Sequence, residues 1–366
     1  MADYLKEYKV TLHTIGPVFI GSGKELSKKE YVISGGKIGV IDLPKLFGFL
    51  QRKGLQSKFE AFFLNDNRMD LYGWLRENSL RPADISGCMK YEIDAGDTAI
   101  IRGTRIQVME FVKDAYGLPY VPGSSIKGML RTILLSDALL RDTDLQSFGG
   151  SAISSALQQG CRNRNTFLNR EQKQIEVKVF NNLNRHEKTS DAVNDFMSGM
   201  RISDSFPLEL SDLVLCQKIE YHKDGTEKTL NMLRECIRPG IDICFNITVD
   251  EKLFNVTPDR IMEAIKNFNS NYDETFRLHF KNGGRSTADS VYLGGGAGFV
   301  SKTDIYPVYG KQKGVEITAD IFRQTKVPGN HKHNLDKSLG VSPHILKMTR
   351  YKGKLYHMGE CSWHFR

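Results

Sequence analysis

The chain lacks the features that mark secreted, membrane-spanning or zinc-binding proteins. Only six of its 366 residues are cysteines, and no two have the Cys-x-x-Cys spacing of a zinc ribbon or redox motif. Scattered single cysteines are typical of reduced, buried thiols in cytosolic proteins. No apolar run approaches the roughly 20 residues that a membrane-spanning helix needs. The first nine residues also lack the apolar core of a signal peptide. These absences predict a cytoplasmic protein with no membrane partner.

The sequence also lacks the motifs of the common catalytic classes. It has no nucleophile elbow, kinase signature set or paired-carboxylate motif. The segment 331–336 (His-Lys-His-Asn-Leu-Asp) offers metal-binding side chains, but their spacing within a basic loop is more typical of a solvated or phosphate-contacting loop. We therefore expect no metal, no cofactor and no catalytic residue. An acid–base pair for RNA cleavage stays open as an alternative, with the candidates His13, His344, His357 and His364.

Positive charge is what the chain has in excess. The formal net charge is +8, and residues 323–366 hold nine Lys/Arg against only Asp336 and Glu360. This basic tail is an indication of polyanion binding. The 40% hydrophobic content is enough for a packed core and argues against global disorder.

The segment 121–131 (Val-Pro-Gly-Ser-Ser-Ile-Lys-Gly-Met-Leu-Arg) is the most informative stretch. Ser124 or Ser125 is suited to cap a helix, and apolar residues at helical spacing predict that helix to run to about residue 141. Lys127 falls in the first turn, where the helix dipole disfavours a cation, and Arg131 lies one turn further on the same face. A phosphate at the helix N-terminus would compensate for this placement. Alternatively, the two cations only form the solvated face of an amphipathic helix.

Glycine is concentrated at two further places. The segment 294–299 has four glycines in five positions, which weakens regular structure and suits close approach to another group. Its N–H groups could form a phosphate nest, with Phe299 stacking on a base and Arg285 and Lys302 neutralising the backbone. It matches neither a P-loop nor a dinucleotide motif, and a tight turn is the alternative. The segment 21–24 (Gly-Ser-Gly-Lys) is a smaller version of the same device, although such loops are common.

Strand-like and helix-like segments follow one another with hairpins rather than regular βα units, which favours an α+β fold with antiparallel sheets. We predict strands at residues 9–15, 31–34, 37–41, 90–93, 105–112, 201–204, 213–221, 230–237, 241–249, 291–293, 345–351 and 355–363. Besides the helix from the Ser-Ser segment, we predict helices at residues 43–51, 58–64, 71–77, 258–268 and 316–324. Residues 147–175 have little apolar periodicity and predict an exposed, mobile, basic insertion. Its part 161–170 is either an RNA-contacting arm or a solvated loop.

Four of these segments together resemble the motifs of the CRISPR-associated RAMP superfamily: 16–23, 120–131, 201–204 (Arg-Ile-Ser-Asp) and 294–299. Two later segments, 342–347 (Ser-Pro-His-Ile-Leu-Lys) and 356–359 (Tyr-His-Met-Gly), are similar to those of the end-capping subunit of the type III-A (Csm) effector complex. The resemblance implies two ferredoxin-like (RNA-recognition-like) RAMP domains with antiparallel sheets and insertions. The first, over 1–205, would carry inserted helices and the basic insertion; the second, over 206–366, would carry the glycine-rich loop and the basic tail.

The resemblance also implies a non-catalytic subunit in antiviral defence. Such a subunit caps the 3′ end of the single-stranded guide RNA (crRNA), supports its maturation and contacts backbone RAMP subunits of the same complex. Trimming nucleases would be further partners. The related target-cutting subunits carry a catalytic Asp in the loop after the first strand, whereas residues 21–30 offer Glu25 and Glu30 but no Asp. Target cleavage is therefore not expected.

Two alternatives stay open at this point: a RAMP-type, metal-independent endoribonuclease that processes precursor guide RNA, and a protein scaffold whose glycine loops grip neighbouring subunits. The residues expected to contact RNA are Gly21, Ser22, Gly23, Lys24, Ser124, Ser125, Lys127, Arg131, Arg285, Gly294, Gly295, Gly296, Gly298, Phe299 and Lys302.

Overall fold

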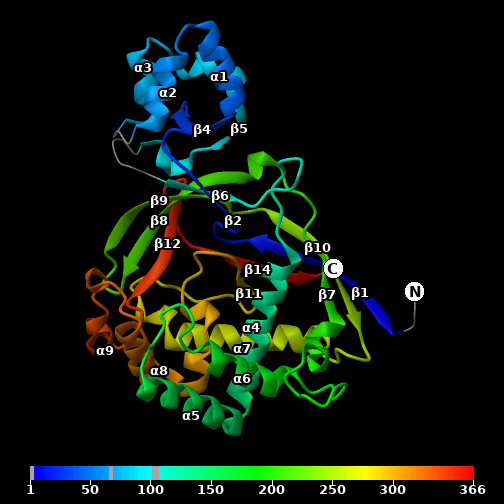
Figure 1. The fold of residues 1–366 in the computed structure, drawn as a ribbon. Coiled ribbons are helices and arrows are strands. Elements are labelled where there is room, and N and C mark those ends of the chain that lie inside the picture. The colour runs from blue at the N-terminus through cyan, green and yellow to red at the C-terminus, as the bar shows by residue number, and fades with distance from the viewer. Residues whose placement is uncertain (1–3, 66–68, 101–106) are drawn as a thin grey trace.

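The computed structural model describes residues 4–65, 69–100 and 107–366, and Figure 1 shows two β-sheets with most of the long helices gathered on one side. The strands are β1 (Leu5–Thr14), β2 (Gly21–Leu26), β3 (Tyr31–Ser34), β4 (Lys37–Ile41), β5 (Met89–Asp94), β6 (Gln107–Phe111), β7 (Met200–Ile202), β8 (Leu213–His222), β9 (Glu227–Ile237), β10 (Asp242–Asp250), β11 (Ser290–Tyr292), β12 (Ile345–Tyr351), β13 (Lys354–His357) and β14 (Glu360–Phe365). The helices are α1 (Leu43–Arg52), α2 (Gln56–Leu64), α3 (Leu71–Glu77), α4 (Gly123–Arg141), α5 (Thr143–Gln159), α6 (Asn169–Phe180), α7 (Pro258–Thr275), α8 (Ile305–Gln324) and α9 (Asp336–Leu339).

The first sheet has five strands in the order β11-β14-β1-β10-β7, all antiparallel. Strand β1 is central because its apolar residues Val10 and Leu12 are buried in the core. It pairs with β10 from Leu5 opposite Asp250 onwards, and with β14 up to Thr14 opposite Cys361. The N-terminal strand therefore lies between two strands from the C-terminal half of the chain.

The second sheet has nine strands. Seven follow the order β2-β6-β9-β8-β5-β4-β3, while β12 pairs with β8 and β13 pairs with β12. The pairs β5–β8 and β6–β9 are parallel and the others are antiparallel. The expected α+β class with mainly antiparallel sheets is confirmed. Both sheets take strands from either side of residue 205, and the division into 1–205 and 206–366 stays a prediction.

A small unit of the helices α1–α3 projects at the top of Figure 1 and packs on β3, β4 and β5, which are also strands of the nine-stranded sheet and contribute Ile38 and Ile93 to the main core. It has its own apolar core, in which Phe62 stacks on Trp74 with ring centroids 5.6 Å apart. The predicted hairpin and the three predicted helices are confirmed here. The hairpin forms because Gly35 and Gly36 supply the two positive φ angles of its tight turn.

The prediction of an aperiodic insertion at 147–175 is wrong. Helices α5 and α6 cover most of it, joined by a short irregular segment that contains 161–168. The apolar periodicity of these helices is weak because glycine and serine occupy positions where a large apolar side chain would normally stand. At these positions the neighbouring helices pack closely. A Cβ on Gly149 would lie 3.1 Å from Ile175 of α6, and one on Gly150 would lie 3.4 Å from Tyr309 of α8.

Other predicted boundaries also differ; for example, β1 begins at Leu5 rather than 9 and α7 ends at Thr275 rather than 268. Helix α8 begins at Ile305 rather than 316, and its two parts meet at Gly310, which has φ 68°. The last predicted strand is two strands, because the chain passes at Met358 and Gly359 from the nine-stranded sheet to the five-stranded one. The strand predicted from residue 105 is described only from Gln107 as β6, since 105 and 106 lie outside the described residues.

Candidate nucleic-acid interface

Three glycine-bearing segments that are distant in sequence meet around one cavity of about 340 Å³. Gly21 comes from the start of β2, and Ser124 and Ser125 from the first turn of α4. Gly294, Gly295 and Lys302 come from the glycine-rich loop between β11 and α8. The structure thus brings together six of the fifteen predicted contact residues, at the N-terminal end of a long helix.

The start of α4 differs from the sequence prediction. The helix begins at Gly123, neither serine caps it, and the N-cap residue is Pro122, which has no side-chain acceptor. The backbone N–H of Gly123 instead donates to Oδ1 of Asp204 at 2.8 Å. Within the described residues neither Ser124 nor Ser125 uses its hydroxyl in a hydrogen bond, so both are available at the cavity.

Lys127 and Arg131 have partners within the protein. The Lys127 Nζ donates to the carbonyl of Met200 at 2.6 Å, and its burial lowers its pKa. The Arg131 guanidinium bonds to Glu176 at 3.0 Å and to Asp195 at 2.7 Å. Carboxylates of the chain itself thus compensate the charge of Arg131, whereas Lys127 bonds to an uncharged carbonyl oxygen. That these two residues contact phosphate stays a prediction, and groups of the chain would compete with the phosphate for both.

The glycine-rich loop approaches another part of its own chain. The Gly295 N–H donates to the carbonyl of Phe19 at 2.7 Å, and a Cβ on Gly294 would lie 2.2 Å from that oxygen. Gly294 also has φ 81°, which side chains rarely adopt. The glycine-rich loop does make the close approach that its glycines predicted, but the group it approaches is the segment of the same chain that leads into β2. One N–H of the proposed phosphate nest is therefore already occupied.

Of the aromatic and basic residues predicted near this loop, only Lys302 lines the cavity. Phe299 is half-buried and packs edge-on against Phe322, with ring centroids 5.1 Å apart, and its role in base stacking stays a prediction. Arg285 is exposed in the loop before β11 and does not line the cavity. Lys302 does line it and has no ion pair in the described part of the chain; its partial burial and the charge of Arg234 lower its pKa.

The segment 21–24 is the exposed first part of strand β2, not a loop. The register with β6 shifts between Gly21 and Glu25, which bends this part of the strand. Ser22 donates to Glu110 at 3.2 Å, and Lys24 is exposed. Gly21 alone of these four residues reaches the cavity shared with α4 and the glycine-rich loop.

Sequence reasoning missed three cations on the strands next to this loop: Lys218 of β8, Arg234 of β9 and Lys347 of β12. A Cβ on Gly296 would lie 2.8 Å from Nη1 of Arg234, and one on Gly298 would lie 3.7 Å from Cγ of Lys347. Each cation stands inside a strand that the sequence pattern predicted. A cation inside a predicted strand is the signal that could have identified these residues, because cations inside a fold normally have an acidic partner.

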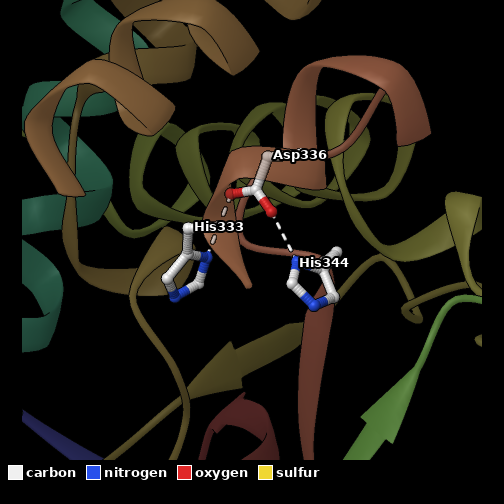
Figure 2. A group of neighbouring side chains, drawn as sticks. All are labelled: His333, Asp336 and His344. Atoms are coloured by element: carbon white, nitrogen blue, oxygen red, sulfur yellow. Dashed lines mark hydrogen bonds and ion pairs between the residues drawn. The ribbon is translucent and has the colours of Figure 1, made fainter. Parts of the chain in front are cut away.

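Figure 2 shows His333 and His344 pointing at the carboxylate of Asp336. The distances are 3.1 Å from Nδ1 of His333 and 2.5 Å from Nδ1 of His344, and the hydroxyl of Ser342 also donates to Asp336. Among the described residues this is the one group of three with suitable metal ligands close together. The carboxylate of Asp336, which is fully buried, already accepts three hydrogen bonds. We interpret the group as a hydrogen-bonded link that holds the segment before β12.

The other candidate histidines do not form an acid–base pair in the described structure. His357 is buried, bonds to the hydroxyl of Tyr272 at 3.0 Å, and has a pKa lowered by burial to about 3. His13 bonds to Asp242, and His364 bonds to Ser362. These three histidines therefore lend no support to the endoribonuclease alternative, which stays untested.

Comparison with known proteins identifies the family. A family model described as the RAMP superfamily matches residues 11–301. A curated relative from Mycobacterium tuberculosis, the CRISPR system Cms protein Csm5, is 30% identical over 400 aligned positions, covering 100% of this chain and 99% of the relative. The protein of that name from Streptococcus thermophilus is 25% identical over 90% of this chain and 92% of the relative. The chain belongs to the RAMP superfamily and, within it, to the Csm5 family.

Two solved structures share the fold. The crystal structure of Csm5 from T. onnurineus matches with a TM-score of 0.64 at 18% identity, covering 96% of this chain and 99% of that one. A chain from a cryo-EM structure of a Csm–crRNA–target RNA ternary complex of a type III-A CRISPR-Cas system matches with a TM-score of 0.58 at 20% identity, covering 98% of this chain and all of that one. The expected RAMP-type domains are thereby confirmed. No helix in the described ranges is long and apolar enough to cross a bilayer.

Proposed function

We propose that this chain is a non-catalytic RNA-binding subunit of a type III-A CRISPR effector complex. In this role it caps the 3′ end of the crRNA, supports its maturation and contributes to complex assembly in antiviral defence. Membership of the Csm5 family supports the proposal, as does the likeness to a chain of a complex that contains crRNA. The backbone RAMP subunits are its proposed neighbours, and trimming nucleases are proposed as transient partners.

The observation that carries the proposal is the convergence of β2, the N-terminus of α4 and the glycine-rich loop on one cavity. Ser124 and Ser125, whose hydroxyls have no hydrogen-bond partner among the described residues, line it at the start of a 19-residue helix, together with Lys302, which has no ion pair in the same part of the chain. These are the groups that hold phosphate oxygens without reading base sequence. A single-stranded backbone fits this chemistry, and binding should be nearly independent of sequence.

The full-length chain tests the proposal when it is purified by a tag from its own host. Short RNAs of repeat–spacer type that co-elute with related subunits would support it. Recovery of the chain without RNA and without related subunits would contradict it. A Lys302→Ala variant should recover less RNA than a Lys266→Ala control, because Lys266 is exposed on α7, away from the cavity lining.

A further inference from the structure

Four cations gather beside the glycine-rich loop, on one face of the nine-stranded sheet. Arg234 is paired across strands with Cys216, so these two residues share a face of the sheet. The register of β8 with β9 shifts at Lys218, but Lys218 lies close enough to Arg234 and Lys347 for burial and their charges to lower its pKa. Lys347 of β12 stands opposite Glu220, which is two positions beyond Lys218 on the same strand. Lys302 comes from the loop, and its burial together with the charge of Arg234 lowers its pKa. The four side chains therefore come from four elements but face one region.

Arg234 has no acidic partner within the described residues. Its Nη1 and Nη2 lie 3.9 Å and 3.7 Å from the sulfur atoms of Met358 and Met232, which are weak acceptors. Its Nε is buried and has no hydrogen-bond partner. The guanidinium carbon lies 5.1 Å from the centre of the Phe19 ring. A partly buried guanidinium with such weak partners is costly to the folded chain, so a ligand that supplies negative oxygens would be bound favourably.

The acids that face this region do not balance the cations. Glu220 bonds to Lys347 at 3.1 Å and is thereby neutralised. Glu25 is in register with Met109, which is in register with Arg234, so Glu25 shares the face but stands two strands away. Lys218 has no ion pair in the described structure; burial and the charges of Lys347 and Arg234 lower its pKa to about 8. The region therefore carries excess positive charge where a charged group is already partly desolvated.

We propose that Arg234, Lys218, Lys302 and Lys347 form an anion-binding site that takes a phosphate group of an RNA backbone. The proposal rests on the proposed function for its ligand, and it extends that function by naming a place of contact with the RNA backbone. Gly296 and Gly298 lie against Arg234 and Lys347, so the glycine-rich loop joins the cation site to the cavity at α4. A bound strand could follow the loop from one to the other. A guanidinium suits two phosphate oxygens, and the flanking ammonium groups supply charge.

The test measures binding of a labelled single-stranded RNA to the full-length chain at several salt concentrations. The variants are Lys218→Met with Arg234→Met, and the matched control is Lys266→Met on the exposed face of α7. The double variant should bind roughly tenfold more weakly or worse, and the slope of log affinity against log salt should fall by about 0.7, the value for one lost phosphate contact on a single strand. The control should keep the wild-type slope.

A second readout separates a binding role from a structural one. Without RNA, Arg234→Met should keep or raise the melting temperature, because it removes a charge that lacks an acidic partner. A melting temperature clearly below that of Lys266→Met would show that Arg234 serves the fold, and would overturn the assignment. Inorganic phosphate, compared with chloride at equal ionic strength, should raise the melting temperature of the wild type and not that of the double variant.

The outcomes distinguish this site from the wider proposal. If wild type and double variant bind RNA with the same affinity and slope, the site is wrong while RNA binding by the chain stands. If the wild type binds no RNA, either alone or within its complex, the proposed function fails. Stabilisation by phosphate with no effect of the variants on RNA binding would assign the site to a free anion and overturn the RNA assignment.

Discussion

The carboxylate of Asp204 accepts a hydrogen bond from the backbone N–H of Gly123 at 2.8 Å, although 81 residues separate the two. Asp204 closes the segment after β7, and Gly123 opens α4. A carboxylate at a helix N-terminus accepts a hydrogen bond from an otherwise free N–H and interacts favourably with the positive end of the helix dipole. This contact joins two of the RAMP-like sequence segments, and it leaves the serines of the first turn free to face the cavity.

Loss of this cap should destabilise the protein without unfolding it. Asp204→Ala should lower the free energy of unfolding by about 1 kcal/mol, the usual cost of removing an N-cap side chain. Asp204→Asn, which keeps an acceptor oxygen, should lower it less. The midpoint of urea denaturation measures both. Equal stability of wild type and Asp204→Ala would show that the contact contributes nothing to the helix.

Arg131 should prove to be a structural residue. Its bonds to Glu176 and Asp195 and its stacking over Phe180 at 4.0 Å hold α4 against α6 and the segment before β7. Arg131→Met should therefore cost about 1–3 kcal/mol of stability, the range for charge-assisted hydrogen bonds. The salt slope of RNA binding should not change. Lys266→Met, at an exposed lysine of α7, is the control. A smaller salt slope of RNA binding for Arg131→Met than for the control would show that Arg131 contacts phosphate.

RNA affinity and protein stability should respond to pH in opposite directions around the pKa of Lys218. Burial and the charges of Lys347 and Arg234 lower this pKa to about 8 in the folded chain, against about 10.4 when unfolded. Between these values the unfolded chain holds more protons, so stability without RNA should rise with pH. RNA affinity should fall over the same range because the ammonium loses its charge. Lys218→Met should remove this part of both pH dependences; an unchanged affinity profile would contradict the role of Lys218.

The Asp336 group should behave as a hydrogen-bonded link. Hydrogen bonds from His333, His344 and Ser342 outweigh the effect of burial and lower the pKa of Asp336. Its contribution to stability should therefore be complete above about pH 4, the usual unfolded pKa, and decline below it. Asp336→Asn should destabilise the chain at neutral pH and weaken this acid dependence. A chelator should leave the melting temperature unchanged; a clear drop would show that an ion holds the group.

Local patterns were sufficient where neighbours in sequence decide the structure. Helix α7 has its predicted start, because Thr257 accepts from the N–H of Arg260 and Pro258 stands in the first turn. The β3–β4 hairpin is set by its two glycines in the same way. Helices α5 and α6 were missed, because Gly149 and Gly150 act through contacts with Ile175, Val308 and Tyr309 that no local window contains.

The candidate site shows the same division. The glycine segments and the helix start were recognisable in the sequence, and they converge on one cavity. The sequence could not show which hydrogen-bond donors are already used within the chain. The N–H of Gly295 donates to the carbonyl of Phe19, and the ammonium of Lys127 donates to the carbonyl of Met200. The sequence also could not show that Arg234 would be left without a carboxylate, because this depends on the register of three strands.

Ultraviolet crosslinking of the chain to guide RNA within its purified complex, followed by mass spectrometry of the crosslinked peptides, tests the account most directly. The account predicts crosslinks to peptides that contain residues 19–26, 124–132, 232–236 and 294–302, which surround the cavity and the cation site. Crosslinks confined to the small unit of α1–α3, or the absence of any crosslink while neighbouring subunits give them, would contradict it.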